Sequence, residues 1–275
     1  MSESESGREP LEWRLRSIVG EDNVLVDEPM SEHTTFRVGG PADLYVVPES
    51  FDEVRDVLLA CDEAGVERFV LGRGSDLLVS DDGYRGVIVA VGEGLMGVSV
   101  DGTEMTCQAG VDLREASEMA CELGFSGLEF ACGIPGSVGG ACFMNAGAYG
   151  GCVADVLKCV RALAPDGSQV TLNVEELDLG YRRSRVAADG LVVLSATFDL
   201  EKGDPEKIRA TMDDLTRQRE EKQPLEMASA GSTFKRPEGH FAGKLIMDAG
   251  LQGYRVGGAE VSRKHAGFVV NTGGA

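Results

Sequence analysis

The sequence predicts an α+β protein, because strand-like and helix-like periods alternate along its 275 residues. Residues 43–47 (DLYVV), 68–71 (RFVL) and 86–91 (GVIVAV) are short apolar runs of the kind that form strands. Ser50 and Glu53, after the first run, form a capping-box pattern that predicts the start of a helix. The apolar stripe and the C-terminal stop of this helix are Val54, Val57, Leu58, Cys61 and Gly65. This first region therefore predicts a βαβ unit.

The second half of the chain adds two helices and a strand to the prediction. Asp112 with Glu115 predicts the start of a helix that stops at Gly124, and Asp204 with Pro205 predicts the start of a charged helix. Residues 191–200 alternate in the manner of a half-exposed strand. The predicted buried positions of these elements are Leu113, Ala116, Ala120 and Leu123, then Val192, Leu194, Ala196, Phe198 and Leu200, then Ile208, Met212 and Leu215.

The composition, 43% hydrophobic and 26% charged residues, is that of a soluble globular protein. A formal net charge of −20 argues against a nucleic-acid backbone or an anionic membrane as partner, although a local pocket can still bind a small anion. The seven cysteines include no C-x-x-C pair and are expected to be buried reduced thiols of a cytosolic protein. With three histidines and no H-E-x-x-H pattern, no metal site is predicted.

The N-terminal residues do not resemble a secretory signal, since they have no basic region and no apolar region. MSESESGREP is acidic and rich in serine, which predicts a short disordered tail ahead of a short helix that ends near residue 20. The final AGFVVNTGGA stops just after an apolar run, so we expect the chain to be cut short there. The clearest candidate for an internal boundary is EKGDPEK, at 201–207.

Three glycine-rich segments are candidates for binding sites. GEGLMG (92–97) matches the G-x-G-x-x-G fingerprint, but the residues that follow alternate like a hairpin around Asp101-Gly102, so a dinucleotide site is disfavoured. GRGSDLL (72–78) follows a predicted strand; it suits either an anion-binding turn or a simple connection.

The third segment is LEFACGIPGSVGGACFMNAGAYGG (128–151). The chain carries no charged residue from 130 to 154, a stretch long enough to span a membrane. Pro135, Asn145 and seven glycines make a membrane helix implausible. Gly133, Gly136, Gly139 and Gly140 permit close backbone approach and positive φ angles, which suits a wall against which a flat cofactor lies.

Two polar segments are candidates for substrate contacts. YRRSR (181–185) places three arginines beside a tyrosine, and arginine binds carboxylate or phosphate in a bidentate manner. The alternative is a solvated surface run. SAGSTFKRP (229–237) sets Ser232 near two cations, where its hydroxyl could donate a proton or simply belong to a turn.

Taken in order, these segments resemble the UDP-N-acetylenolpyruvoylglucosamine reductases, flavoenzymes of bacterial peptidoglycan precursor synthesis. The residues that carry the resemblance span 33–271 and are HTTFRVGG, LGRGSDLLVSDDGYRGVIV, GLEFACGIPGSVGGACFMNAGAYGG, YRRSR, KQPLEMASAGSTFKRPEGHFAGKLI and GYRVGGAEVSRKHAGFVVN. HFAGKLI and GAEVSRKHAGF are similar to the shorter, type II subgroup.

The resemblance implies a two-lobed FAD-binding domain of the vanillyl-alcohol-oxidase/PCMH type at 21–202, with lobes at about 21–92 and 93–202. An α+β substrate domain, incomplete here, would occupy 203–275. In this family FAD is bound non-covalently and NADPH reduces it. The reduced flavin then passes hydride to the enolpyruvyl double bond of the UDP-sugar, which gives UDP-N-acetylmuramate.

The resemblance also implies residue roles. Arg182 would bind the substrate carboxylate and stabilise the charge that develops beside it, and Ser232 would deliver the proton. Tyr181, Lys222 and Arg236 would contact substrate. The expected FAD contacts are Gly72, Arg73, Gly74, Ser75, Asp76, Gly133, Ile134, Pro135, Gly136, Ser137, Gly139, Gly140 and Asn145.

Three positions depart from the family pattern. Asp76 stands where the family usually has Asn, and Arg236 stands where the longer subgroup has Asn. The family's C-terminal catalytic Glu has no counterpart before residue 275. Two other functions stay open. One is an oxidase or dehydrogenase of the same fold with FAD attached covalently, for which His33 is the candidate. The other is binding of FAD or the UDP-sugar without turnover.

Overall fold

The computed structural model describes residues 3–275, with side chains from residue 10 onward, and the chain forms two compact units. Unit 1 contains the residues up to Glu28, Ala42–Arg73 and Tyr84–Leu215. Unit 2 contains Pro29–Pro41, Gly74–Gly83 and Thr216–Ala275. Two internal loops thus belong with the C-terminal part of the chain.

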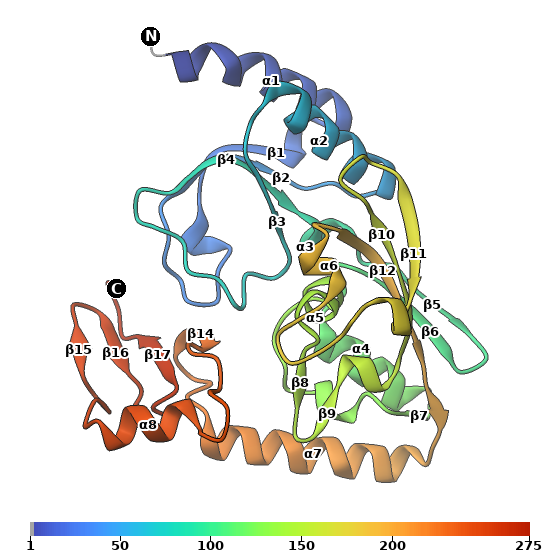
Figure 1. The fold of residues 1–275 in the computed structure, drawn as a ribbon, viewed down its shortest axis with the longest axis vertical. Helices are drawn as coiled ribbons and strands as arrows, with labels where there is room; N and C mark the ends of the chain where they lie inside the picture. The colour runs from blue at the N-terminus through green and yellow to red at the C-terminus, as the bar shows by residue number, and fades with distance from the viewer. Residues whose placement is uncertain (1–2) are drawn as a thin grey trace. The chain divides into compact units, whose positions relative to one another are not determined.

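Helices and strands alternate throughout, as the α+β prediction requires (Figure 1). The helices are α1 (Glu3–Val19), α2 (Phe51–Ala64), α3 (Val91–Gly94), α4 (Leu113–Glu122), α5 (Val138–Met144), α6 (Arg185–Ala188), α7 (Pro205–Lys222) and α8 (Ala242–Asp248). The strands are β1 (Val24–Pro29), β2 (Pro41–Val46), β3 (Arg68–Leu71), β4 (Tyr84–Ala90), β5 (Val98–Asp101), β6 (Glu104–Gln108), β7 (Phe125–Ser126), β8 (Gly147–Ala148), β9 (Gly151–Cys152), β10 (Leu157–Leu163), β11 (Gln169–Asn173), β12 (Val192–Asp199), β13 (Glu201–Lys202), β14 (Ala228–Ser232), β15 (Arg255–Val256), β16 (Ala259–Val261) and β17 (Phe268–Asn271). Short 3-10 turns lie at Glu21–Asn23, Met30–Glu32, Glu129–Ala131, Val153–Asp155 and Val174–Glu176.

The first sheet of unit 1 has the strand order β1-β2-β4-β3, and both β2 and β3 run parallel to β4. The predicted βαβ unit is confirmed, since α2 connects two parallel strands of one sheet. The two strands are not neighbours, however, because β4 pairs between them.

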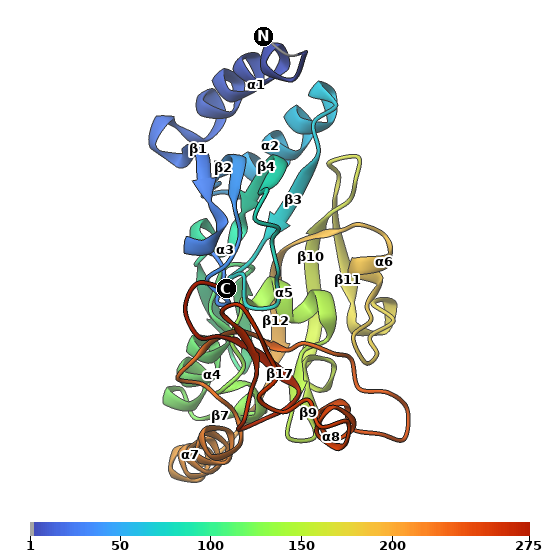
Figure 2. The same ribbon diagram turned by 90° about the vertical axis from the view of Figure 1, so that its left-hand side faces the viewer.

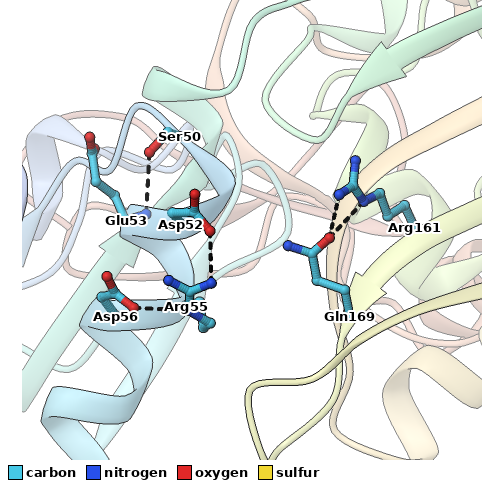
Figure 3. Close-up of polar contacts among 7 residues, drawn as sticks. All are labelled: Ser50, Asp52, Glu53, Arg55, Asp56, Arg161 and Gln169. Atoms are coloured by element: carbon cyan, nitrogen blue, oxygen red, sulfur yellow. Dashed lines mark hydrogen bonds and ion pairs between the residues drawn. The ribbon is translucent and has the colours of Figure 1, made fainter.

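The cap of α2 is confirmed in detail (Figure 3). Ser50 Oγ accepts a hydrogen bond from the backbone N–H of Glu53 at 3.2 Å, which satisfies one of the unpaired donors of the first turn. The Glu53 carboxylate accepts from the N–H of Glu49 at 2.7 Å, one residue earlier than a standard capping box. Gly65 closes the helix with φ 63°, a conformation that glycine adopts without strain.

The helix α2 also contacts the second sheet. The Arg161 guanidinium lies 5.1 Å from the centroid of the Phe51 ring, a cation–π contact. The same guanidinium donates two hydrogen bonds to Gln169 Oε1 across the β10–β11 hairpin (Figure 3). Arg161 therefore ties the start of α2 to an edge of the second sheet.

The N-terminal helix is longer than the sequence predicted. The expected disordered tail is wrong for residues 3–10, because α1 begins at Glu3 and continues through Pro10. Leu11, Leu15 and Val19 are buried at i, i+4 and i+8, and α1 packs beside α2 (Figure 1). This packing supplies stability that local propensity does not.

The second sheet of unit 1 is antiparallel, with the order β11-β10-β12-β6-β5. Figure 2 labels three of its strands, β10, β11 and β12. The prediction that β12 is half-exposed is wrong, because Val193 and Ser195, on its opposite face, are also buried. This strand is central in the sheet and α5 packs against it. The burial predicted for Leu123 is also wrong: it follows α4 as the C-cap and is 50% exposed.

One hydrophobic core joins the two sheets of unit 1, with Leu44 and Val87 from the first and Met105 and Leu194 from the second. The thiols of Cys61, Cys107, Cys121 and Cys142 are buried, and all seven cysteines are free. Nowhere among residues 3–275 does a helix combine the length and hydropathy needed to cross a membrane.

Unit 2 is built on a four-stranded sheet of order β14-β17-β16-β15, antiparallel at each junction. Its core is small and contains Met30, Val38, Ala266, Phe268 and Val270. Asn271 at the end of β17 donates to the carbonyl of Phe36, and Thr35 Oγ1 donates to the carbonyl of Ser229. The loop at 29–41 is thereby fastened to the sheet of this unit.

Candidate functional site

The GEGLMG segment does not open a dinucleotide-binding helix. The four-residue α3 is followed by the β5–β6 hairpin, which turns at Asp101-Gly102 as predicted. Gly92 nevertheless has a packing role that the sequence analysis missed, since a Cβ added there would lie 2.3 Å from the carbonyl oxygen of Gly72. This contact brings the segment against the GRGSD turn.

Gly72 and Ser137, from two different predicted FAD loops, lie side by side in unit 1. A Cβ added at Gly72 would lie 2.5 Å from Ser137 Oγ, so a side chain there would force the hydroxyl of Ser137 to move. Ser137 also forms an isolated β-bridge with Asp112, the N-cap of α4. The structure therefore brings the 72–73 and 133–140 segments together.

Arg73 lies beside the same Asp112, which was predicted as a cap but not as part of a site. Its Nε is 3.8 Å from Asp112 Oδ2, an ion pair too long to be a hydrogen bond. That nitrogen is buried and has no hydrogen-bond partner in the described part of the chain. A buried donor without an acceptor is a candidate for contact with an anionic ligand.

Gly139 and Gly140 differ in whether the packing of the protein requires a glycine. A Cβ at Gly139 would lie 2.9 Å from that of Ala109, so packing requires glycine there. At Gly140 the nearest atom, Ser137 Oγ, would be 3.4 Å away and the position is exposed. A glycine within a helix lowers the free energy of unfolding by about 1 kcal/mol relative to alanine. At position 140 no neighbouring protein atom requires glycine, so packing does not explain why the chain has one there.

Three contacts join the end of α5 to the turn at 180–184, which carries Tyr181 and Arg182. Asn145 Nδ2 donates to the Gly180 carbonyl at 3.3 Å, and Arg182 Nη1 contacts Met144 Sδ at 3.2 Å. Ser184 Oγ donates to the Phe143 carbonyl. The predicted glycine wall at 133–140 therefore leads into the start of α5, and the predicted arginine site contacts the end of the same short helix.

The three arginines of YRRSR have different partners. Arg183 pairs with Asp178 at 2.9 Å, and Arg185 pairs with Asp189 at 2.7 Å. Arg182 has no carboxylate partner in the described part of the chain, and its guanidinium carbon lies 5.8 Å from the Tyr181 ring. Its backbone has φ 55°, which is rare for a residue with a side chain.

In unit 2, Gly74 packs against the 29–41 loop. It has φ 60°, a Cβ there would lie 2.0 Å from the His33 carbonyl oxygen, and its own carbonyl accepts from Thr35 N–H. Ser75 and Asp76 follow it in the same unit. Arg37, in the same loop, also has a positive φ, 55°, and its carbonyl accepts from Asn271; the sequence analysis did not single it out.

Ser232 is the last residue of β14 and follows an irregularity in the ladder. The register of β14 against β17 shifts between Ser229 and Ser232, and Gly231 within that interval has φ 75°. Ser232 is exposed. Such bulges re-aim side chains and are common beside active sites.

The remaining predicted substrate residues also lie in unit 2. Lys222 is the exposed last residue of α7. Arg236 stacks on Phe241, with its guanidinium carbon 3.9 Å from the ring centroid, and its Nε donates to the His240 carbonyl at 3.4 Å.

Comparisons with known proteins decide the family. The chain is 48% identical to the UDP-N-acetylenolpyruvoylglucosamine reductase of Clostridium kluyveri, over 95% of its own length and 86% of the relative's. It is 51% identical to that of Clostridium perfringens strain SM101, with the same coverages. This chain belongs to the UDP-N-acetylenolpyruvoylglucosamine reductase family. The model of that reductase's C-terminal domain matches residues 223–275, and an FAD binding domain model matches residues 42–173.

Solved structures agree with this membership. The UDP-N-acetylenolpyruvylglucosamine reductase from Thermus caldophilus superposes with a TM-score of 0.79 at 36% identity, over 92% of this chain and 88% of that one. A 4-ethylphenol oxidase from Gulosibacter chungangensis gives 0.56 at 16% identity, over 72% and 43%. p-Cresol methylhydroxylase gives 0.52 at 14% identity, over 73% and 44%. The predicted fold type is confirmed: this reductase family has the FAD-binding fold of those flavoproteins.

Proposed function

We propose that this protein reduces the enolpyruvyl group of UDP-N-acetylenolpyruvoylglucosamine to give UDP-N-acetylmuramate, in the cytoplasm, with NADPH as reductant. Non-covalent FAD, when bound, supplies the hydride. Family membership supports the reaction class. The observation that carries the assignment to residues is the state of Arg182, an exposed guanidinium without a carboxylate partner among the described residues of an acidic protein.

Arg182 is suited to bind the substrate carboxylate. Its neighbours Arg183 and Arg185 already have acidic partners, so the turn offers one arginine to a ligand. A guanidinium binds a carboxylate through two parallel hydrogen bonds. It also stabilises the negative charge that develops beside that carboxylate when hydride reaches the neighbouring carbon.

The residues of unit 1 fit FAD. Gly140 is exposed and unobstructed, and Arg73 has a buried donor without an acceptor among the described residues. The unpartnered guanidinium N–H of Arg73 suits a phosphate of a dinucleotide cofactor, and the lack of a side chain at Gly140 permits close approach of the cofactor to the backbone. The proposed FAD contacts of unit 1 are Gly72, Arg73, Gly133, Ile134, Pro135, Gly136, Ser137, Gly139 and Gly140. Gly74, Ser75 and Asp76, which belong to unit 2, are proposed from the family resemblance.

Ser232 is proposed to deliver a proton to the substrate carbon that carries the carboxylate. Its exposed hydroxyl, set by the bulge at Gly231, supports this role. Tyr181, Lys222 and Arg236 are proposed to bind other groups of the substrate. We retain the division into an FAD domain at 21–202 and a substrate domain at 203–275.

The test is NADPH oxidation by the purified, FAD-loaded chain with and without UDP-N-acetylenolpyruvoylglucosamine, and with UDP-N-acetylglucosamine as the matched control. We expect oxidation that depends on the enolpyruvyl group and a product heavier than the substrate by two hydrogens. Equal rates with both sugars would refute the proposed reaction. Acid precipitation should release all flavin to the supernatant; yellow colour in the pellet would instead indicate covalent FAD and an oxidase.

The Gly140→Ala variant tests the FAD site separately. The new methyl group fits the protein and improves helix propensity, so the free energy of unfolding without FAD should stay the same or rise. If the cofactor lies against this backbone, FAD affinity should fall at least tenfold. Unchanged FAD affinity would exclude Gly140 from the site.

A further inference from the structure

The turn that presents Arg182 is a two-residue hairpin. Gly180 and Arg183 exchange two backbone hydrogen bonds, of 2.9 and 3.2 Å, and Tyr181 and Arg182 lie between them. Arg182 has φ 55°. Such a conformation costs a residue with a side chain on the order of 1 kcal/mol or more, so other contacts must hold it.

Asn145 supplies one of these contacts, at the carbonyl that begins the hairpin. Its Nδ2 donates to the Gly180 carbonyl, which also accepts from the N–H of Arg183. Its Oδ1 accepts from the N–H of Ala154 at 3.0 Å. Both ends of the amide therefore bond to backbone groups, one nine residues and the other 35 residues along the chain.

Asn145 itself has a left-handed backbone, φ 48° and ψ 62°, and is the C-cap of α5. Asparagine tolerates this conformation better than most residues. The helix that it ends packs against β12 in the core of unit 1, so the amide is held on a rigid element. Asn145 thus connects a fixed support to the hairpin of Arg182.

We propose that Asn145 is a positioning residue that holds the Gly180–Arg183 hairpin in the conformation that presents the Arg182 guanidinium to the substrate carboxylate. This inference rests on the proposed function. It replaces direct contact with the flavin as the main role of the Asn145 side chain, because both its amide oxygen and its amide nitrogen are bonded within the protein.

Two variants test the proposal, and a third serves as the control. Asn145→Gly tolerates the left-handed backbone but loses both hydrogen bonds, and Asn145→Asp keeps the acceptor for Ala154 but loses the donor to Gly180. Asp178→Asn removes the ion pair of Arg183 from the same loop and leaves the Asn145 contacts intact.

The kinetic readout is the rate at which the UDP-sugar reoxidises the prereduced holoenzyme in a single turnover. Both Asn145 variants should lower this rate about tenfold, and Asp178→Asn should leave it within twofold. In an Arg182→Ala background, the Asn145 variants should have no further effect. Equal slowing in both backgrounds would overturn the proposal, as would a loss of FAD affinity that accounts for the whole effect.

The second readout needs no turnover. Amide hydrogen exchange over residues 177–186 should quicken at least fivefold in both Asn145 variants, while residues 157–163 of β10 stay protected. Unchanged protection of the hairpin would overturn the proposal whatever the activity. If the wild type lacks substrate-dependent reoxidation but the hairpin loosens as expected, the proposed function fails and the structural role of Asn145 stands.

Discussion

The turn at Arg182 in unit 1 and the bulge at Ser232 in unit 2 both place a proposed catalytic side chain on irregular backbone, but they hold it differently. The side chains of Met144 and Asn145, at the end of α5, contact the Arg182 hairpin, and Ser184 beside the hairpin donates back to the Phe143 carbonyl of that helix. Ser232 is set by the register of two strands and by the positive φ of Gly231.

The difference follows from the length of the two side chains. A serine hydroxyl lies one bond beyond Cβ, so the backbone and a single side-chain torsion, χ1, set its direction. An arginine has a long flexible side chain, and fixing its guanidinium costs rotamer entropy. A rigid turn and a neighbouring contact lower this cost, because they restrict the side chain before the substrate binds. Variants of Ser232 should therefore act directly, whereas the Arg182 site should also respond to changes in its supports.

The largest effect is expected for Ser232→Ala. Without a proton donor, reoxidation of the prereduced holoenzyme by the UDP-sugar should slow on the order of a thousandfold, because general acids contribute about 10²–10⁴. FAD should stay bound, as its visible spectrum would show. Ser229→Ala, in the same strand, is the control and should keep the wild-type rate. If Ser232→Ala loses FAD, the serine is structural.

A smaller effect, about a hundredfold, is expected for Arg182→Lys in the same assay. Lysine keeps the positive charge but cannot form the bidentate pair with the carboxylate. Arg183→Lys, next to it and paired with Asp178, should change the rate less than twofold. Equal effects of the two substitutions would mean that the assignment of the carboxylate to Arg182 is wrong.

The bulge can be broken by Gly231→Ala. Both Gly231 (φ 75°) and Gly250 (φ 73°) have open space where a Cβ would lie, so alanine at either should cost about 1 kcal/mol of unfolding free energy from backbone strain. Only Gly231→Ala should also slow flavin reoxidation, about tenfold, by turning Ser232. Equal rates of flavin reoxidation in Gly231→Ala and Gly250→Ala would show that the bulge does not position Ser232 for proton delivery.

The smallest effect is expected in the free energy of unfolding at alkaline pH. All seven cysteines lie in unit 1, so the ionisation of buried thiols should affect the stability of that unit and not of unit 2. Burial raises the pKa of the Cys142 thiol from 9.0 to about 12. Since the unfolded thiol ionises first, the folded state is favoured fully below pH 9, and this advantage is lost as the pH rises from 9 towards 12.

Urea unfolding of the wild type at pH 8 and pH 10 measures this loss. Cys142→Ala should lose about 1 kcal/mol less between the two pH values than the wild type does. An identical loss in both proteins would show that the thiol ionises equally in the folded state.

Features that depend on near neighbours in sequence were predicted well. The cap and stop of α2, the hairpin at Asp101-Gly102 and the start of α7 at Pro205 follow from hydrogen bonds and φ preferences within a few residues. The reductase family, and with it the FAD-binding fold type, was also evident from the motifs, because their order along the chain is itself specific.

Features that depend on distant partners needed the tertiary structure. The second face of β12 is buried because strands and a helix from elsewhere in the chain surround it, and α1 extends to Glu3 as a helix that packs on α2. The residue pattern at 181–185 did not separate the three arginines, and the choice of Arg182 came from the family resemblance. The folded chain places Asp178 and Asp189 beside two of them and Met144 beside the third, so Arg182 is the one without a carboxylate partner among the described residues. This could not be predicted from the pattern, since an ion pair depends on which charges folding brings together.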